Sequence, residues 1–425
     1  MSTLALSQLG RRTTEPPVSW LMSTALARPN LISLAAGFTD SESLPVDEAR
    51  ELLQEVLGSA KTGRAALQYG TTAGDAGLRR LTGEHLHRQD GASRPAALYS
   101  PERLFISSGS QQLLYLLSEC LCEPGDLVLL EDPTYFVYLG IVQSHGLGCR
   151  GVPLAPDGID LAHLERTLES LKRGGALRRL KLLYLVSYFQ NPTGVSAVWE
   201  KKAAALELLR RYEKPAGHPI YLLEDAAYRE LRFAGEDVPS LLIARRAAER
   251  VIYAGTFSKP FATGVRVGYG VVPEALLKVV LRLKANHDFG TSNLLQQLMK
   301  QALATGAYDR HLRVLRERYA RKAAVMARAI RQHFPPQVDW DEPRGGLYVW
   351  ARLPNHLKSG MKSRLFRAAL RHDVLYVPGE LCYAPDPTRP RPNHEMRISF
   401  GGASVPDIRT GIARLGATLQ ELLAA

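Results

Sequence analysis

The sequence predicts an α/β fold in which helices cover both faces of a mostly parallel sheet. Short apolar runs of strand length recur along the chain, and helical patterns lie between them. Strands that alternate with helices are typical of parallel sheets, whose strands are joined by helical crossovers. The 425 residues, 45% of them hydrophobic, can bury a large core, and this length favours two domains over one.

Five apolar runs are expected to form the central strands of the sheet, at residues 103–107, 127–131, 181–186, 220–224 and 251–255. The helical patterns between them include residues 111–121 and 200–214. Open sheets of this kind bind ligands beyond the carboxyl ends of their strands. The residues that follow each strand are therefore the first candidates for a functional site.

Charge and composition narrow the class of protein. The formal net charge of +12 is compatible with nucleic acid, a membrane surface or an anionic small molecule as the partner. The basic residues are scattered through helical stretches such as residues 312–333, where they fall mostly between the apolar positions. That pattern favours a solvated helix face, so we expect neither a nucleic-acid nor a membrane partner. No apolar run reaches the ~18 residues of a membrane span.

Cysteines and histidines carry no metal or disulfide signal. The four cysteines match no zinc or redox spacing, which fits a reducing compartment, and we expect a cytoplasmic protein. His85 and His87 lie two apart in a helical pattern and so point to different faces, and no metal site is predicted. Residues 1–17 are interpreted as a flexible arm, with an organelle transit segment as the alternative.

Polar or aromatic side chains follow all five predicted strands. They are Gly109, Ser110 and Gln111 after the first strand, Tyr135 after the second, Asn191 after the third, Asp225 and Tyr228 after the fourth, and Ser258 and Lys259 after the fifth. Arg266 follows the lysine by seven positions. Each has a structural alternative, such as a loop cation, a helix cap, a turn or a core phenol. Together, however, they would lie on one rim of the sheet.

The chemistry of these groups points to one cofactor. An amine is expensive to bury, but a lysine can form an imine with an aldehyde, and pyridoxal 5′-phosphate (PLP) then supplies an electron sink. Asp225 is the candidate carboxylate that would keep the pyridine nitrogen protonated. Asn191 and Tyr228 are the candidate donors to the ring oxygen, where they would lower the imine pKa.

The phosphate of such a cofactor has its own requirements. It needs backbone N–H groups at a helix start and a bidentate cation. Gly109, Ser110 and Gln111 would provide the helix start, and Arg266 the cation. Ser258 is a further candidate donor, and the flat ring of Tyr135 could stack on the cofactor ring.

With these residues in this order and spacing, the chain resembles the PLP-dependent aminotransferases of fold type I, class I/II. The run "TFSKPFATGVRVGY" resembles the family's lysine signature, with lysine and arginine seven apart. "QYGTTAGDAGLR", "GSQQ", "DPTY", "NPTG", "EDAAY", "GGLYVW" and "RISF" also match in family order. The resemblance extends from about residue 30 to 420. In overall pattern the sequence is similar to the group acting on 2-aminoadipate, aromatic or multiple substrates.

The resemblance implies further roles. Arg397 would hold the substrate α-carboxylate, in a position also approached by Asn191 and the backbone of Gly37. Tyr69 would reach the cofactor phosphate of a neighbouring subunit, which implies a homodimer with shared active sites. The region of Trp20 shapes the substrate side-chain pocket in relatives and departs from their pattern here, so the choice of substrate stays open.

The resemblance also implies a domain layout and a reaction. A large PLP-binding domain is expected at residues 46–305 and a small α+β domain at 306–425, with residues 1–45 forming an N-terminal arm and part of the small domain. The expected reaction moves an amino group between an α-amino acid and a 2-keto acid, in a ping-pong mechanism through an imine at Lys259. Lys259, Asp225 and Tyr228 are the expected catalytic residues.

Two alternatives use the same inner residues. One is another fold type I PLP enzyme, such as a C–S lyase, which differs in what excludes transamination. The other is a PLP-sensing transcription regulator. Such regulators carry a winged helix-turn-helix ahead of this fold, and a resemblance that starts near residue 30 is expected to leave no room for it.

Overall fold

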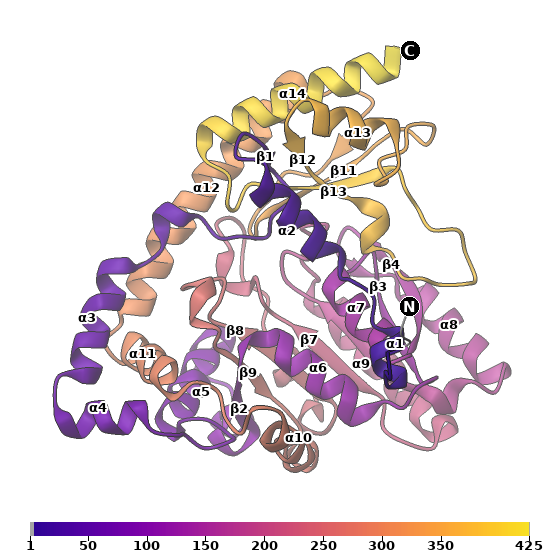
Figure 1. The fold of residues 1–425 in the computed structure, drawn as a ribbon. Helices are drawn as coiled ribbons and strands as arrows, with labels where there is room; N and C mark the ends of the chain where they lie inside the picture. The colour runs from indigo at the N-terminus through magenta and orange to yellow at the C-terminus, as the bar shows by residue number, and fades with distance from the viewer. Residues whose placement is uncertain (1–3, 425) are drawn as a thin grey trace.

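A large mixed sheet forms the centre of the molecule in the computed structural model, which describes residues 4–424 (Figure 1). Within these residues, eight strands follow the spatial order β2 (Leu104–Ser107), β9 (Gly268–Val271), β8 (Val251–Thr256), β7 (Tyr221–Asp225), β6 (Leu180–Val186), β3 (Leu127–Asp132), β4 (Gly148–Ala155) and β5 (Gly158–Ile159). β8, β7, β6, β3 and β4 pair in parallel, whereas β9 and β5 run antiparallel to their neighbours. The mostly parallel α/β sheet predicted from the sequence is confirmed, and each predicted central strand is present.

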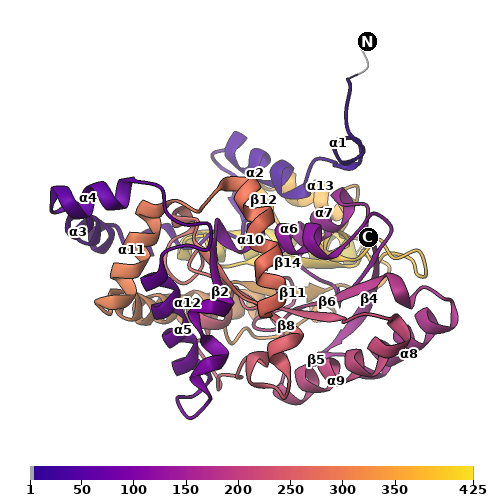
Figure 2. The same cartoon turned by 90° about the horizontal axis from the view of Figure 1, so that it is seen from below.

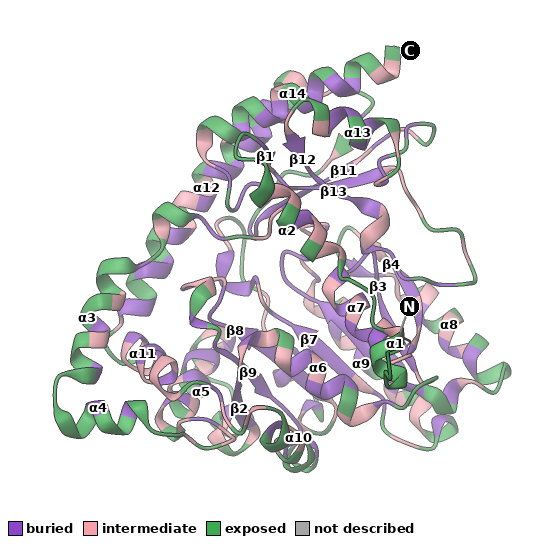
Figure 3. Cartoon of the chain, in the orientation of Figure 1, coloured by how far each residue is buried: buried purple, intermediate pink, exposed green. Residues whose placement is uncertain are grey.

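The strands read as nearly continuous apolar runs because helices cover both faces of the sheet. Phe105, Val128 and Leu182 face one layer of helices, and their neighbours Leu104, Leu129 and Leu183 face the other. The first layer contains α6 (Gly109–Leu121), α7 (Phe136–Ser144) and α10 (Glu274–Asp288). The second contains α5 (Ala76–Asp90), α8 (Leu161–Arg173) and α9 (Trp199–Ala216). In Figure 3 the central strands β3, β7 and β8 are accordingly buried along nearly their whole length.

A smaller sheet lies beside the large one. In the described chain its four antiparallel strands follow the order β10 (Asp339–Trp340), β11 (Tyr348–Arg352), β14 (Glu395–Ser399) and β13 (Val377–Pro378). Beside it, β1 (Ile32–Ser33) pairs in parallel with β12 (Val374–Leu375). The helices of this part are α13 (Arg364–Arg371) and α14 (Val405–Ala424). Figure 1 shows the long helix α12 (Ala307–His333) running from this part along the side of the molecule. The domain boundaries near residues 46 and 306 stay predictions.

The remaining helices lie at the margins. α3 (Val46–Leu57), α4 (Ala60–Leu67) and α11 (Asn293–Ala304) pack together at one end of the molecule (Figures 1 and 2). The predicted N-terminal arm forms α1 (Gln8–Arg12) and α2 (Pro17–Ala27), while residues 1–3 lie outside the described part. α1 docks on α7, where Arg12 Nε donates to the carbonyl of Ser144 at 3.3 Å. Between residues 4 and 424, no helix is both long and apolar enough to cross a bilayer.

Candidate active site

Two cavities share a wall at the carboxyl edge of the parallel strands. The inner cavity has a volume of about 110 Å³ and reaches Asp225 at the end of β7. The outer cavity, of about 260 Å³, extends toward α2 and Arg397. Most of the predicted residues line the inner cavity, namely Ser110, Gln111, Tyr135, Asn191, Asp225, Tyr228, Ser258, Lys259 and Arg266. Gly37 and Arg397 line the outer one. The rim predicted from the strand ends therefore exists as one site.

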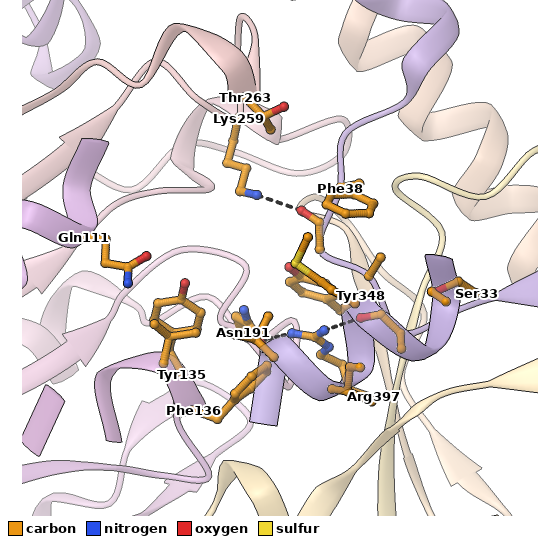
Figure 4. A pocket seen from close by; sticks show the side chains of 18 of the residues that line it. Ser33, Phe38, Gln111, Tyr135, Phe136, Asn191, Lys259, Thr263, Tyr348 and Arg397 are labelled. Atoms are coloured by element: carbon orange, nitrogen blue, oxygen red, sulfur yellow. Dashed lines mark hydrogen bonds between the residues drawn. The ribbon is translucent and has the colours of Figure 1, made fainter. Parts of the chain in front are cut away.

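Lys259 lies at the junction of the two cavities, just beyond β8. Its Nζ donates to the carbonyl of Gly37 at 2.7 Å, the bond drawn from the lysine in Figure 4. Burial lowers the pKa of the Lys259 amine to about 8, and the positive charges of Arg397 and Arg266 contribute to the same shift. The neutral form, which a nucleophile or general base requires, is therefore more accessible here than for an exposed lysine.

Asp225 closes the inner end of the inner cavity. Its Oδ2 accepts from the hydroxyl of Tyr184 at 2.8 Å, and its Oδ1 accepts from the backbone N–H of Ala227 at 3.0 Å. Burial raises the pKa of the Asp225 carboxyl to about 6, although these two hydrogen bonds favour the charged form. A buried carboxylate of this kind fits the protonated ring nitrogen of PLP, because a cation placed there would relieve the unfavourable burial.

The opposite side of the inner cavity has the features of a phosphate site. The thirteen-residue helix α6 begins here at Gly109, so its free N–H groups and positive dipole end face the cavity. Arg266 Nη1 donates to Ser258 Oγ at 3.3 Å, and its guanidinium lies against Gly109. β9 supports the helix start closely, because a Cβ at Gly268 would lie 2.5 Å from backbone atoms of Gly109 and Ser110. These groups fit the phosphate of PLP.

Arg397, on β14, dominates the outer cavity. Nη1 donates to Asn191 Oδ1 at 2.7 Å and Nη2 donates to the carbonyl of Ala35 at 2.5 Å (Figure 4). The guanidinium carbon lies 4.2 Å from the ring centre of Tyr348, and the buried Nε has no hydrogen-bond partner among the described residues. A buried guanidinium with a free donor and neutral neighbours fits a ligand carboxylate.

Comparison with known proteins identifies the family. The sequence profile described as "Aminotransferase class I and II" matches residues 29–415. The chain belongs to this family. It is 35% identical over 400 residues to the 2-aminoadipate transaminase of Thermus thermophilus, a match that covers 93% of this chain and 92% of the relative.

Two similar solved structures contain the cofactor in its aminated or substrate-linked form. The kynurenine aminotransferase of Pyrococcus horikoshii, in complex with PMP, superposes with a TM-score of 0.88 at 29% identity over 99% of this chain and 98% of that one. LysN of Thermus thermophilus, complexed with N-(5′-phosphopyridoxyl)-L-leucine, superposes with a TM-score of 0.84 at 31% identity over 99% of this chain and 98% of that one. The protein is a PLP-dependent aminotransferase of fold type I, and the predicted family, cofactor and amino-group transfer are confirmed.

The predicted site residue Tyr69 of the aminotransferase lines neither cavity, and neither does Trp20, whose region was expected to shape the substrate pocket. Tyr69 is 83% exposed and its ring packs edge-on against Phe289, with centroids 5.5 Å apart. Trp20 packs on Phe366 at a centroid distance of 6.0 Å, whereas its neighbours Val18, Leu21 and Met22 line the outer cavity. The region of α2 therefore does shape the pocket, but through other side chains than Trp20.

Sequence reasoning missed two tyrosines of the aminotransferase site. Tyr184 supports Asp225, and the Tyr348 hydroxyl lies 2.9 Å from the hydroxyl of Tyr228. Tyr184 lies within a predicted strand and Tyr348 at the start of β11, and in a strand an aromatic residue is expected for packing alone. Strand alternation indicates which residues share a face. This alternation does not indicate which residues of other elements contact that face, so the sequence carries little signal for either role.

Proposed function

We propose that this aminotransferase moves an amino group from an α-amino acid with an apolar side chain to a 2-keto acid, in two half-reactions at the paired cavities. The observation that carries the proposal is the position of Arg397. Its buried guanidinium, with Nε free, stands across the outer cavity from Lys259, whose amine has a lowered pKa. An amino acid held by its carboxylate at Arg397 would have its α-carbon near that amine.

The chain's own residues divide the work. PLP, when bound, accepts the electron pair that is released when the Cα–H bond of the amino acid breaks. Lys259 would supply the amine that condenses with the cofactor aldehyde, with loss of water. Once displaced by the substrate amine, its neutral Nζ would take the α-proton and return it. Arg397 fixes the carboxylate, so the Cα–H bond is presented to Lys259 in a constant orientation.

Other residues hold the cofactor. Asp225 would keep a proton at the ring nitrogen, and Asn191 and Tyr228 would donate to the ring oxygen. The start of α6 with Ser110 and Gln111, together with Ser258 and Arg266, would hold the phosphate. The assignment of Tyr135 to stacking on the ring belongs to the same proposal and is supported by its place in both cavity walls.

The outer cavity supports an apolar substrate side chain. The wall opposite Lys259 is built from Val18, Leu21 and Met22 of α2 with Phe136 and Val137 of α7. Among the described lining residues, the charged ones are Lys259, Arg266 and Arg397, and each has a role already. A second carboxylate on the substrate would lose part of its hydration in this cavity without gaining a further cation, which is unfavourable.

A panel of amino acids tests the proposal. PLP-loaded protein is mixed with one amino acid and no keto acid, and the keto acid formed per site is measured by mass spectrometry. Leucine, methionine and phenylalanine should each give about one equivalent, much faster than glutamate or 2-aminoadipate. Lys259→Ala serves as the inactive control. Absence of any keto acid would remove the proposal, and equal rates with glutamate would remove its apolar part.

The homodimer is part of the proposal. Exposed apolar side chains gather around Tyr69, which follows α4. They include Leu67 at the end of α4, 70% exposed, and Phe289 just after α10, 54% exposed. A patch of this kind is typical of a protein interface. Shared sites are tested by co-expressing Tyr69→Ala with Lys259→Ala chains. Hybrid dimers contain one intact site if Tyr69 acts across the interface, and they should then be more active than either parent.

A further inference from the structure

Tyr348 connects the cofactor side of the site with the substrate side. It opens β11, is 2% exposed and lines the outer cavity. In the antiparallel pairing of β11 with β14, Trp350 lies opposite Arg397. Tyr348, two residues before Trp350, is therefore the diagonal neighbour of Arg397 on the same face of the sheet. Figure 4 shows its ring beside Arg397. The chain passes close to its hydroxyl at Gly37, where a Cβ would lie 2.8 Å from the Tyr348 oxygen.

The hydroxyl of Tyr348 contacts the cofactor side of the site. It lies 2.9 Å from the Tyr228 hydroxyl, which also accepts from Asn191 Nδ2 at 3.4 Å. Within residues 4–424, Tyr228 is its hydrogen-bond partner and no second acceptor is present. A phenol has one proton and two acceptor lone pairs. If Tyr228 gives its proton to the ring oxygen of PLP, the Tyr348 proton must point to Tyr228. A phenol that accepts a hydrogen bond becomes a stronger donor.

The ring of Tyr348 contacts the substrate side. The Arg397 guanidinium lies 4.2 Å from its centre, closer than to the ring of Phe136 at 5.4 Å. Stacking on an aromatic face keeps the planar fork in one orientation while leaving its N–H edges free. The hydroxyl and the ring of one side chain therefore act on different parts of the reaction.

We propose that Tyr348 is a positioning residue, whose hydroxyl strengthens the Tyr228 hydrogen bond to the cofactor ring oxygen and whose ring orients Arg397 for the substrate carboxylate. This inference rests on the proposed function. It predicts that the two effects separate in variants: phenylalanine removes the hydroxyl and keeps the ring, and leucine removes both.

The experiment compares PLP-loaded wild type, Tyr348→Phe and Tyr348→Leu. The first measurement is the pH at which the absorption spectrum of the lysine-bound cofactor changes. In Tyr348→Phe this midpoint should rise by about half a pH unit to one unit, because a weaker donor at the ring oxygen disfavours the unprotonated form. The second is KM for leucine, which should be unchanged in Tyr348→Phe and raised about tenfold or more in Tyr348→Leu.

Tyr376→Phe is the matched control. Tyr376 is also a buried tyrosine, but its hydroxyl donates to the Ser359 carbonyl at 2.8 Å and it lines neither cavity. This variant should leave both the spectral midpoint and KM unchanged, while its melting temperature reports the effect of losing a buried hydroxyl.

The outcomes separate this inference from the proposed function. A spectral midpoint in Tyr348→Phe equal to that of the wild type overturns the hydroxyl role, and a wild-type KM in Tyr348→Leu overturns the ring role. If Tyr348→Leu does not fold, the spectral midpoint of Tyr348→Phe still tests the role of the hydroxyl. Failure of the wild type itself to show a pH-dependent cofactor spectrum would instead contradict the attachment of PLP at Lys259.

Discussion

Replacing Gly268 by alanine should weaken the binding of PLP, because this glycine lets the start of α6 rest directly on β9. Gly268 pairs with Ser107 of β2 on one side and Thr256 of β8 on the other, so the strand cannot move aside. A Cβ at this position would lie 2.5 Å from the carbonyl carbon of Gly109 and from the nitrogen of Ser110. Both atoms belong to the backbone and cannot rotate out of the way.

The magnitude follows from the displacement. An ordinary van der Waals contact begins near 3.4 Å, so the first turn of α6 must retreat by about 0.9 Å from the 2.5 Å position. Overpacking of this size is unfavourable by about 1–3 kcal/mol. The N–H groups that would hold the phosphate move with the helix start. If most of this energy is expressed in cofactor binding, the Kd for PLP should rise about 10- to 100-fold.

The assay is a fluorescence titration of apoprotein with PLP, paired with thermal unfolding of the apo and loaded forms. Gly264→Ala is the matched control, since a Cβ there meets no atom within 4 Å. The control should bind PLP like the wild type. A Gly268→Ala protein with wild-type PLP affinity and wild-type melting temperature would refute the argument that α6 and β9 jointly hold the phosphate.

Three further predictions follow from the site. Between pH 8 and 10.5 the desolvated amine of the partly buried Lys259 binds fewer protons in the folded than in the unfolded apoprotein, so stability rises with pH across this window. Lys259→Met should abolish this dependence of the unfolding free energy on pH and stabilise the apoprotein by up to about 3 kcal/mol at pH 7, measured by urea unfolding. The same pH dependence in the variant and the wild type would show that the amine is not desolvated. Arg397→Lys should raise KM for the amino acid about 10- to 100-fold, because lysine cannot form the bidentate fork; an unchanged KM in steady-state kinetics would place carboxylate binding elsewhere. Tyr184→Phe should raise the pKa of Asp225 further by removing a donor to its charged form, so PLP affinity should fall more at pH 6 than at pH 8. A pH-independent loss in a binding titration would contradict this.

The central strands and the rim of the site were predictable because two strong physical signals coincide. Strands such as β6 and β8 are apolar throughout, since both faces of the sheet are covered, and a parallel sheet brings their carboxyl ends to one edge. Asn191, Asp225 and Lys259 could therefore be assigned to one site from their positions after the strands alone. Their roles with the cofactor stay predictions.

Other features lacked such a signal. β9 is four residues long and contains Gly268 and Gly270, which have low strand propensity, so its insertion between β2 and β8 was not predicted. The glycines are explained by α6, which packs directly against them, and this contact is visible only in three dimensions. Tyr348 reaches Arg397 through the register of β11 with β14, and register between strands distant in sequence is not readable from local patterns.

The two hydrogen bonds from Arg397 to Ala35 and from Lys259 to Gly37 span 362 and 222 sequence positions. The segment that carries these carbonyls is anchored by β1, whose partner β12 leaves the ribosome among the last strands. Contacts of such long separation close late, because the entropy of loop closure must be overcome first. The groups proposed to hold the phosphate, which are the start of α6, Ser258 and Arg266 with the supporting Gly268, all lie before residue 269. A nascent chain halted after β9 would thus possess the elements that hold the phosphate long before it could recognise an amino acid.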